Sequence, residues 1–213
     1  MLTLSPETLS ILKNFSTINS SIYITQGSVI KTISPAKTIM AKANIKETID
    51  RGFAIYDLNR FLSVLSLFDN PNIEISKNVA VIKQDKKKVN YTFTDPSMIV
   101  YPEKDNPKVG QSIYSFSLNE DQLKSAIKGL NVLALPELRF VGEDGKVVLQ
   151  AIDVKNPTSD FYSIEVGESD KDFAITIKKE NFLIIASNYQ VDVFKGTLKL
   201  SNDVLTYYIA ASE

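Results

Sequence analysis

The sequence predicts an α+β chain that is built from two similar domains. Segments with apolar residues at helical spacing alternate with short runs rich in Ile, Val and Thr, which are typical of strands. The same order of helices and strands occurs twice along the chain. Between the halves, residues 95–111 (DPSMIVYPEKDNPKVGQ) contain three prolines and few periodic apolar residues, which favours an extended linker. We therefore expect a first domain over 1–94, an interdomain linker over 95–111 and a second domain over 112–213.

Local sequence similarity supports the internal repeat. Phe61–Ser66 (FLSVLS) lines up with Phe182–Ser187 (FLIIAS), and Ser76–Val79 lines up with Ser201–Val204. The alternative is a chance similarity between amphipathic segments, but here the order of elements and the local sequence agree. We therefore expect four related helices, two in each half.

Two helices are expected in the first half. Ser5 can cap a helix that has Pro6 at its first position, and Asp57 can cap the second. The apolar side chains that these helices should bury are Leu9, Leu12 and Phe15 on the first, and Leu58, Phe61, Leu65 and Phe68 on the second. Strands are expected at 21–25, 28–33, 38–43, 53–56, 72–76, 79–83 and 89–94.

The second half should follow the same plan. Asn119 can cap a helix that buries Leu123, Ile127 and Leu130, and a short fourth helix is expected over 179–188. Asp144-Gly145 is a strong hairpin signal. Strands are expected at 112–117, 138–141, 146–152, 162–166, 173–177, 191–194, 197–200 and 204–210.

The composition excludes several classes of enzyme. With no Cys, the chain has no disulfide, no thiolate metal site and no Cys nucleophile. With no His, it has no imidazole base, no Ser-His-Asp triad and no His-ligated zinc. No glycine pattern of the phosphate-cradling type is present, so we expect no nucleotide cofactor. Glu120 and Asp121 are best explained by the first turn of a helix, where the macrodipole favours negative charge, rather than as a catalytic pair.

Charge and hydropathy point to a soluble intracellular protein that does not grip nucleic acid tightly. Lys and Arg total 24 against 25 Asp and Glu, whereas a tight DNA binder is usually strongly basic. The longest apolar runs, such as 182–186, span about five residues, against roughly 20 for a membrane-spanning helix. The first residues lack a basic region before an apolar stretch, so we expect no secretory signal.

Basic residues occur in two settings. The run Lys83–Lys88 (KQDKKK) falls at an expected hairpin turn, where a solvated turn that discourages edge pairing is favoured over a nucleic-acid patch. Each expected helix also offers at least one cation on or beside its polar side, and these residues are Lys13, Arg60, Lys124, Lys128 and Lys179. Their recurrence on four related helices suggests a shared surface.

Two segments in the first half resemble the sliding clamp of T-even-type bacteriophages. Ile11–Ser20 (ILKNFSTINS) is similar to the first-helix motif of that family, and Ala54–Leu62 (AIYDLNRFL) is similar to its second-helix segment. Asp95-Pro96-Ser97, with Val100, Pro102 and Lys104, resembles its linker. In the second half the resemblance rests on length and element order.

The resemblance implies the processivity fold, with helices inside and antiparallel sheets outside, and three chains in a ring around duplex DNA. It further implies a non-enzymatic role: tethering the replicative DNA polymerase in the cytoplasm of the infected bacterial host, after loading by an ATP-driven clamp loader. Late transcription through sigma-like partners is implied as well. On this reading, the helix cations named above face DNA.

The resemblance also implies an apolar pocket beside the linker for a partner peptide. The candidate residues lie in the linker and in the final strand, and they are Met98, Ile99, Val100, Tyr101, Pro102, Leu205, Tyr207, Tyr208 and Ile209. The alternative is that some of these side chains simply fill the two cores, because alternate positions on a strand face inwards.

Two other functions stay open at this point. A β-rich structural or scaffolding protein with duplicated domains would explain the repeat and the missing catalytic groups, but not the two motif matches. A carboxylate-dependent nuclease would need a cluster of Asp and Glu around magnesium, and the sequence shows no such cluster.

Overall fold

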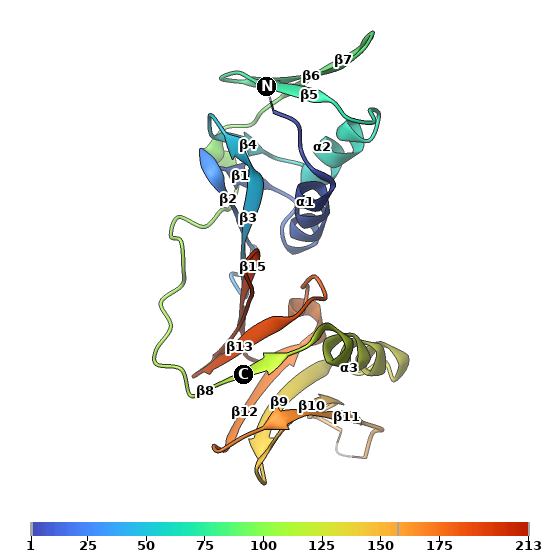
Figure 1. Cartoon of the computed structure of the whole chain (residues 1–213), viewed down its shortest axis with the longest axis vertical. Coiled ribbons are helices and arrows are strands. Elements are labelled where there is room, and N and C mark those ends of the chain that lie inside the picture. The colour runs from blue at the N-terminus through green and yellow to red at the C-terminus, as the bar shows by residue number, and fades with distance from the viewer. Residues whose placement is uncertain (1, 157, 213) are drawn as a thin grey trace. The chain divides into compact units, whose positions relative to one another are not determined.

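The chain divides into two compact units that each combine helices with antiparallel strands. The computed structural model describes residues 2–156 and 158–212. The units are Met1–Asp105 (unit 1) and Asn106–Glu213 (unit 2), and Figure 1 shows the elements of each. This arrangement confirms the α+β class that the sequence predicts.

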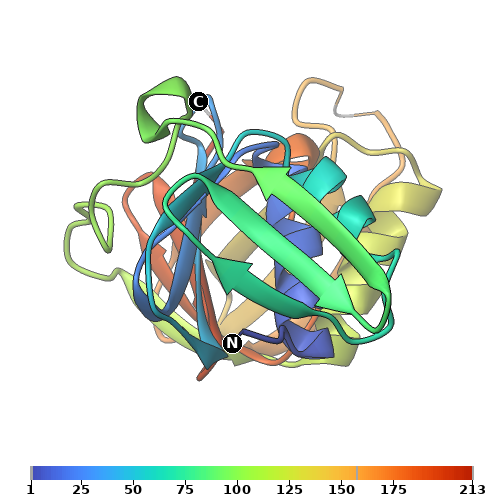
Figure 2. The same cartoon turned by 90° about the horizontal axis from the view of Figure 1, so that it is seen from above.

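Unit 1 places two helices against antiparallel strands. Strand β1 pairs with β4, β2 pairs with β3, and a three-stranded sheet has the order β5-β6-β7. Figure 2 looks onto this three-stranded sheet. Helix α1 lies on β2 and β3, and α2 packs beside α1. The elements are α1 (Pro6–Ile18), β1 (Ile22–Ile24), β2 (Gly27–Ile33), β3 (Ile39–Ile49), β4 (Phe53–Ile55), α2 (Leu58–Leu65), β5 (Asn72–Ile75), β6 (Val79–Gln84), β7 (Lys87–Thr92) and the 3₁₀ turn η1 (Pro96–Met98).

The start of α1 is held by its own cap and by a carboxylate from β3. The Ser5 hydroxyl accepts a hydrogen bond from the Thr8 amide at 3.3 Å. Glu47 accepts hydrogen bonds from the Ser5 amide and, at 2.6 Å, from the Thr8 hydroxyl. Burial alone would raise the pKa of Glu47, but these hydrogen bonds lower the pKa overall. The structure therefore places a carboxylate at the positive end of the helix dipole, where negative charge is stabilising.

The expected caps and stripes of both helices are largely confirmed. Asp57 caps α2 by accepting a hydrogen bond from the Arg60 amide at 2.9 Å. The buried apolar residues are Ile11, Leu12, Phe15 and Ile18 on α1, and Leu58, Phe61 and Leu65 on α2. Leu9, which was expected in the buried stripe, is only half-buried.

Unit 2 has one α-helix among its described residues. Its sheets have the orders β11-β10-β9-β12 and β15-β14-β13-β8, and α3 packs across β11, β10 and β9. The elements are β8 (Tyr114–Leu118), α3 (Glu120–Val132), β9 (Glu137–Glu143), β10 (Lys146–Ile152), β11 (Tyr162–Glu168), β12 (Phe173–Lys178), the 3₁₀ turn η2 (Lys179–Asn181), β13 (Tyr189–Phe194), β14 (Thr197–Ser201) and β15 (Leu205–Ala210).

Helix α3 is fixed at its start by a capping box and in its last turns by a close contact with β11. The Asn119 side chain accepts from the Gln122 amide at 2.8 Å, and the Gln122 side chain accepts from the Asn119 amide at 3.1 Å. Gly129 lies against Tyr162, where an added Cβ would come within 2.6 Å of ring atoms. A hydrogen bond of 2.6 Å joins the hydroxyls of Ser125 and Tyr162. Glycine is therefore required in this helix by packing.

The prediction of a fourth helix over residues 179–188 is wrong. Residues 179–188 form only the short turn η2 and then run without helical structure to β13. The hydroxyl of Tyr189 donates to the Ile185 carbonyl at 2.6 Å, and the Ile185 amide donates to the Tyr207 hydroxyl oxygen at 3.3 Å. Ile184 and Ile185 are β-branched, which lowers helix propensity, and the two tyrosines supply backbone partners that a helix would otherwise provide.

The basic run also differs from its expected placement. Strand β6 continues to Gln84 and β7 begins at Lys87, so the hairpin turn holds only Asp85 and Lys86. Asp85 has a φ of 53°, which suits a tight two-residue turn. Lys87 and Lys88 therefore belong to a strand rather than to a loop.

No helix among the described residues is long and apolar enough to span a bilayer.

Candidate nucleic-acid and partner interfaces

Two of the five candidate DNA-facing residues lie on the helices of unit 1. Lys13 on α1 and Arg60 on α2 are both exposed. The helices that carry them pack against each other. The two cations are therefore carried by neighbouring helices of unit 1.

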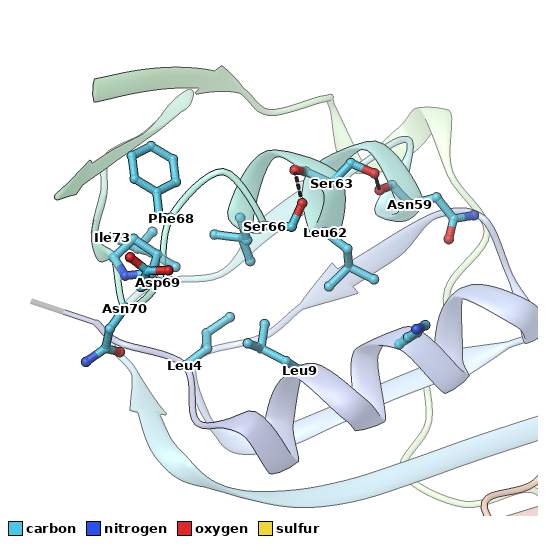
Figure 3. Close-up of a pocket in the computed structure, with 13 residues that line it drawn as sticks. Leu4, Leu9, Asn59, Leu62, Ser63, Ser66, Phe68, Asp69, Asn70 and Ile73 are labelled. Carbon is cyan, nitrogen blue, oxygen red and sulfur yellow. Dashed lines mark hydrogen bonds between the residues drawn. The ribbon is translucent and has the colours of Figure 1, made fainter. Parts of the chain in front are cut away.

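A groove of about 420 Å³ lies between α1 and α2 in unit 1 (Figure 3). Leu4, Leu9 and Leu62 contribute apolar surface, while Lys13 and Asn59 contribute polar groups. The remaining lining residues are Ser63, Leu65, Ser66, Phe68, Asp69, Asn70, Pro71 and Ile73. The sequence did not reveal this groove, because Leu9 and Leu62 read simply as members of amphipathic helices. The half-burial of Leu9 follows from its position on the wall of the groove.

In unit 2, α3 carries Lys124 and Lys128 on exposed positions. Lys124 pairs with Glu120, four residues earlier, and this hydrogen bond raises the pKa of the Lys124 ammonium. Both partners are exposed, so the pair contributes little to stability and leaves the lysine able to exchange partners.

Lys179 does not lie on a helix of the expected kind. It is an exposed residue of η2, and its amide donates to the Pro136 carbonyl at 2.8 Å, which places it near the loop that follows α3. The structure thus brings Lys179 near the end of α3 without the fourth helix that was expected to carry it.

The linker segment of the candidate partner site presents exposed apolar surface in unit 1. Met98 is 66% exposed and Val100 is 43% exposed, whereas Pro102 is buried. Tyr101 packs against Tyr23 with ring centroids 4.9 Å apart. The Asn19 side chain donates to the Val100 carbonyl at 3.0 Å. Ile99 is half-buried. This segment is therefore anchored to unit 1, while Met98 and Val100 remain exposed.

The C-terminal segment of the same candidate site lies on β15 of unit 2. Leu205, Tyr207 and Ile209 have exposures of 6%, 0% and 0%, so these three side chains fill the core, which is the alternative that the sequence left open. Burial raises the pKa of Tyr207 to about 12. Tyr208 is half-buried, and its hydroxyl donates to the Asn106 side chain at 3.2 Å. Of the four candidate residues on this strand, Tyr208 is the one that is not buried.

The structure gives no support to the nuclease alternative. In residues 2–156 and 158–212, no group of three or more His, Cys, Asp or Glu side chains is placed to hold a metal ion.

Comparisons with known proteins agree with the geometry. Residues 5–109 match the family model described as DNA polymerase processivity factor. The chain is 31% identical to the sliding clamp of Escherichia phage RB69, over 97% of this chain and 95% of the relative. It is 30% identical to the sliding clamp of Enterobacteria phage T4, over 97% of this chain and 95% of the relative.

Solved structures show the same fold at low identity. The proliferating cellular nuclear antigen of Entamoeba histolytica superposes with a TM-score of 0.72 at 13% identity, covering 96% of this chain and 94% of that one. A putative DNA polymerase III beta subunit from Eubacterium rectale gives 0.71 at 15% identity, covering 99% of this chain and 64% of that one. Helices with exposed cations, antiparallel sheets and nearly full-length similarity all lead to one conclusion: the chain belongs to the family of phage sliding clamps, the non-enzymatic processivity factors of DNA polymerase.

Proposed function

We propose that three copies of the chain close into a ring around duplex DNA and slide along it. Lys13, Arg60, Lys124, Lys128 and Lys179 face the DNA in this ring. The observation that carries the proposal is the combination of exposed cations on or beside α1, α2 and α3 with a net charge of only −1. Each phosphate that a protein neutralises increases affinity, so a few weak contacts on a near-neutral protein favour sliding over gripping.

The ring holds the replicative DNA polymerase by a short peptide of the polymerase. The anchor site lies in the 98–102 segment, where Met98 and Val100 are exposed, together with Tyr208. One structure of the same fold holds the C-terminal region of FEN-1 on A. fulgidus PCNA, which supports a peptide as the class of partner. A buried anchor of this kind typically contributes about 2 kcal/mol or more to binding.

Three further roles belong to the same proposal. An ATP-driven clamp loader opens the ring and places it on DNA in the cytoplasm of the infected bacterial host. Sigma-like partners use the loaded ring for late transcription. Residues 1–94 and 112–213 act as the two clamp domains, and residues 95–111 join them. A purely structural role for duplicated domains is not favoured, because the full-length relatives are sliding clamps.

Two measurements test the ring. Light scattering should give three times the chain mass of 23.7 kDa at micromolar concentration. Protein loaded on nicked circular DNA with a clamp loader and ATP should stay bound during gel filtration and should be lost when the DNA is linearised. A monomer at high concentration, or equal retention on circular and linear DNA, would contradict the proposal.

A further inference from the structure

We infer that Asn19 is a positioning residue for the partner peptide: its side-chain amide holds the backbone of the 98–102 segment on unit 1. Asn19 directly follows α1 and lies 81 residues before Val100 in the chain. It is only 5% exposed, so it acts through the segment rather than by contact with a peptide. The inference rests on the proposed peptide site and adds a residue that controls this site from beneath.

Every hydrogen-bonding group of the Asn19 side chain is used. Its oxygen accepts from the Ser21 amide at 2.9 Å and from the Ser21 hydroxyl at 3.1 Å. A backbone amide can only donate, so the oxygen must face Ser21 and the NH₂ group must face the other way. The nitrogen donates to the Ile33 carbonyl at 2.8 Å and to the Val100 carbonyl at 3.0 Å. The side chain is thereby fixed in one orientation, with one N–H group directed at the linker.

The backbone around Asn19 joins several elements of unit 1. The Asn19 amide donates to the Phe15 carbonyl at 3.0 Å, where α1 ends. The Ser20 carbonyl accepts from the Leu58 amide at 2.7 Å, where α2 begins. Ile33 is the last residue of β2. The amide that contacts the linker is therefore mounted on two helix ends and a strand end, and regular elements hold a side chain more precisely than loops do.

The linker needs such an anchor because residues 99–105 have no helix or strand. Two further contacts hold this stretch: the Tyr101 ring packs on Tyr23, and the Asp105 carboxylate pairs with the Lys31 ammonium at 2.7 Å. Asp105 is 80% exposed, so its ion pair contributes little and is screened by salt. Of these three contacts, the hydrogen bond from Asn19 is the one that fixes the backbone.

This bond keeps the apolar side chains of the segment available. The Val100 carbonyl is bound to the buried Asn19, while the Val100 side chain is 43% exposed and that of Met98 is 66% exposed. A peptide that binds a mobile segment must either select its competent fraction or order it on binding, and both reduce the observed affinity. Asn19 removes that cost because it holds the segment in place before the peptide arrives.

The alternative is that Asn19 serves only to end α1 and to hold β2. Its bonds to Ser21, Ile33 and the Phe15 carbonyl would be sufficient for that role. The bond to Val100 joins neither α1 nor β2 to anything but the linker. The experiments therefore need a variant and a measurement that report on the linker alone.

Asn19→Asp keeps the size of the side chain and its acceptor oxygen but removes both N–H donors. A polymerase C-terminal peptide should bind this variant about five- to tenfold more weakly in calorimetric titration. Hydrogen exchange in the free protein should accelerate at the amides of 98–104, whereas exchange within α1 and α2 should be unchanged. Ser21→Ala, which keeps the Val100 bond, and Lys31→Met, which removes the exposed ion pair, are the controls and should change the affinity by less than about twofold.

A backbone substitution tests the same bond without altering any side chain. Replacing the amide between Val100 and Tyr101 by an ester makes the Val100 carbonyl a weaker acceptor, and peptide binding should weaken about threefold or more. The matched control is an ester between Glu103 and Lys104, two exposed linker residues, and it should leave the affinity unchanged. This protein decides the question if Asn19→Asp does not fold by circular dichroism.

The possible failures are distinguishable. If the original chain does not bind the peptide, the proposed partner site fails and the inference fails with it. If the original chain binds, and the folded Asn19→Asp and ester proteins bind equally well, only the present inference is overturned. It is also overturned if exchange in Asn19→Asp accelerates throughout unit 1, because Asn19 would then be a purely structural residue.

Discussion

The hydroxyl of Tyr189 donates a 2.6 Å hydrogen bond to the carbonyl oxygen of Ile185, four residues earlier. Together with the contact from the Ile185 amide to Tyr207, this bond fixes a non-helical segment in the position where a helix was expected. Burial raises the pKa of the Tyr189 hydroxyl, so the group remains a protonated donor throughout the neutral range.

Tyr189→Phe should lower the free energy of unfolding by about 1–2 kcal/mol, because the Ile185 carbonyl loses its donor in a part-buried site. Urea titration followed by circular dichroism measures the change. Tyr208→Phe is the control, because its hydroxyl bonds a side chain at an exposed site and should change stability by less than about 0.5 kcal/mol. Equal effects in both variants would mean that the segment does not depend on the Tyr189 bond.

Glu47→Gln should destabilise unit 1 by about 1–2 kcal/mol at pH 7, because a neutral amide is a weaker acceptor for the Ser5 amide and the Thr8 hydroxyl. The folded state lowers the pKa of Glu47, so its contribution is fully present above the unfolded value of 4.5 and is lost as pH falls through the folded pKa. The stability curves of the two proteins should therefore approach each other as the pH falls below 4.5 and through the lowered pKa of Glu47. Glu103→Gln, in an exposed part of the linker, should show no such convergence.

Gly129→Ala should destabilise α3 even though alanine is the better helix former. Helix propensity favours alanine by about 1 kcal/mol, whereas the new methyl would lie 2.6 Å from the Tyr162 ring, and overpacking of this kind costs about 1–3 kcal/mol. Thermal unfolding should show a lower Tm for this variant. Gly110→Ala meets no atom within 4 Å and should leave Tm unchanged. A higher Tm for Gly129→Ala would show that β11 can shift to accommodate the added methyl group without a net loss of stability.

Reversing Lys13, Arg60 and Lys128 to Glu should reduce loading and processive synthesis severalfold while the assembly mass stays the same. The loss should grow as salt is raised, because the few remaining phosphate contacts are screened further. Primer extension on a long template at several salt concentrations measures the effect. The control variant carries the same charge change at other exposed sites, with the substitutions Lys37→Glu, Lys108→Glu and Lys195→Glu. Full processivity of the first variant at physiological salt would remove these residues from the DNA-facing surface.

Tyr101→Ala should weaken binding of a polymerase C-terminal peptide about tenfold or more, because Tyr101 packs on Tyr23 and supports the exposed 98–100 segment. Tyr208→Ala should have a smaller effect. Calorimetric titration gives both affinities, and Tyr56→Ala, a 64% exposed tyrosine of unit 1, is the control. If neither Tyr101→Ala nor Tyr208→Ala changes the affinity of an intact trimer, the partner site lies elsewhere.

Local signals in the sequence predict an element correctly where its stabilising hydrogen bonds join residues close together in the chain. Ser5, Asp57 and Asn119 were all identified as caps because each bonds an amide within three residues. The Asp144-Gly145 hairpin followed for the same reason, and both residues have the positive φ that the turn requires. These elements depend on interactions within a few residues of chain.

Distant contacts explain what the sequence did not reveal. The segment at 182–188 resembles α2 in sequence, but its backbone is bonded by tyrosines from β13 and β15. The groove between α1 and α2 depends on how far apart two helices pack, which periodicity does not encode. The sequence predicts a hairpin turn across the lysine run, whereas the tight turn at Asp85 extends both strands into the run.

The dependence of the 182–188 segment on Tyr207 has a consequence for synthesis on the ribosome. Unit 1 can fold as soon as it emerges, because domains generally fold as units from the N-terminus. Ile185 must wait for Tyr207, which lies 22 residues further along the chain, so the segment is fixed only after that tyrosine has left the exit tunnel. A nascent chain thus carries a finished unit 1 and an incomplete unit 2, so prematurely terminated products lack part of the second unit's core.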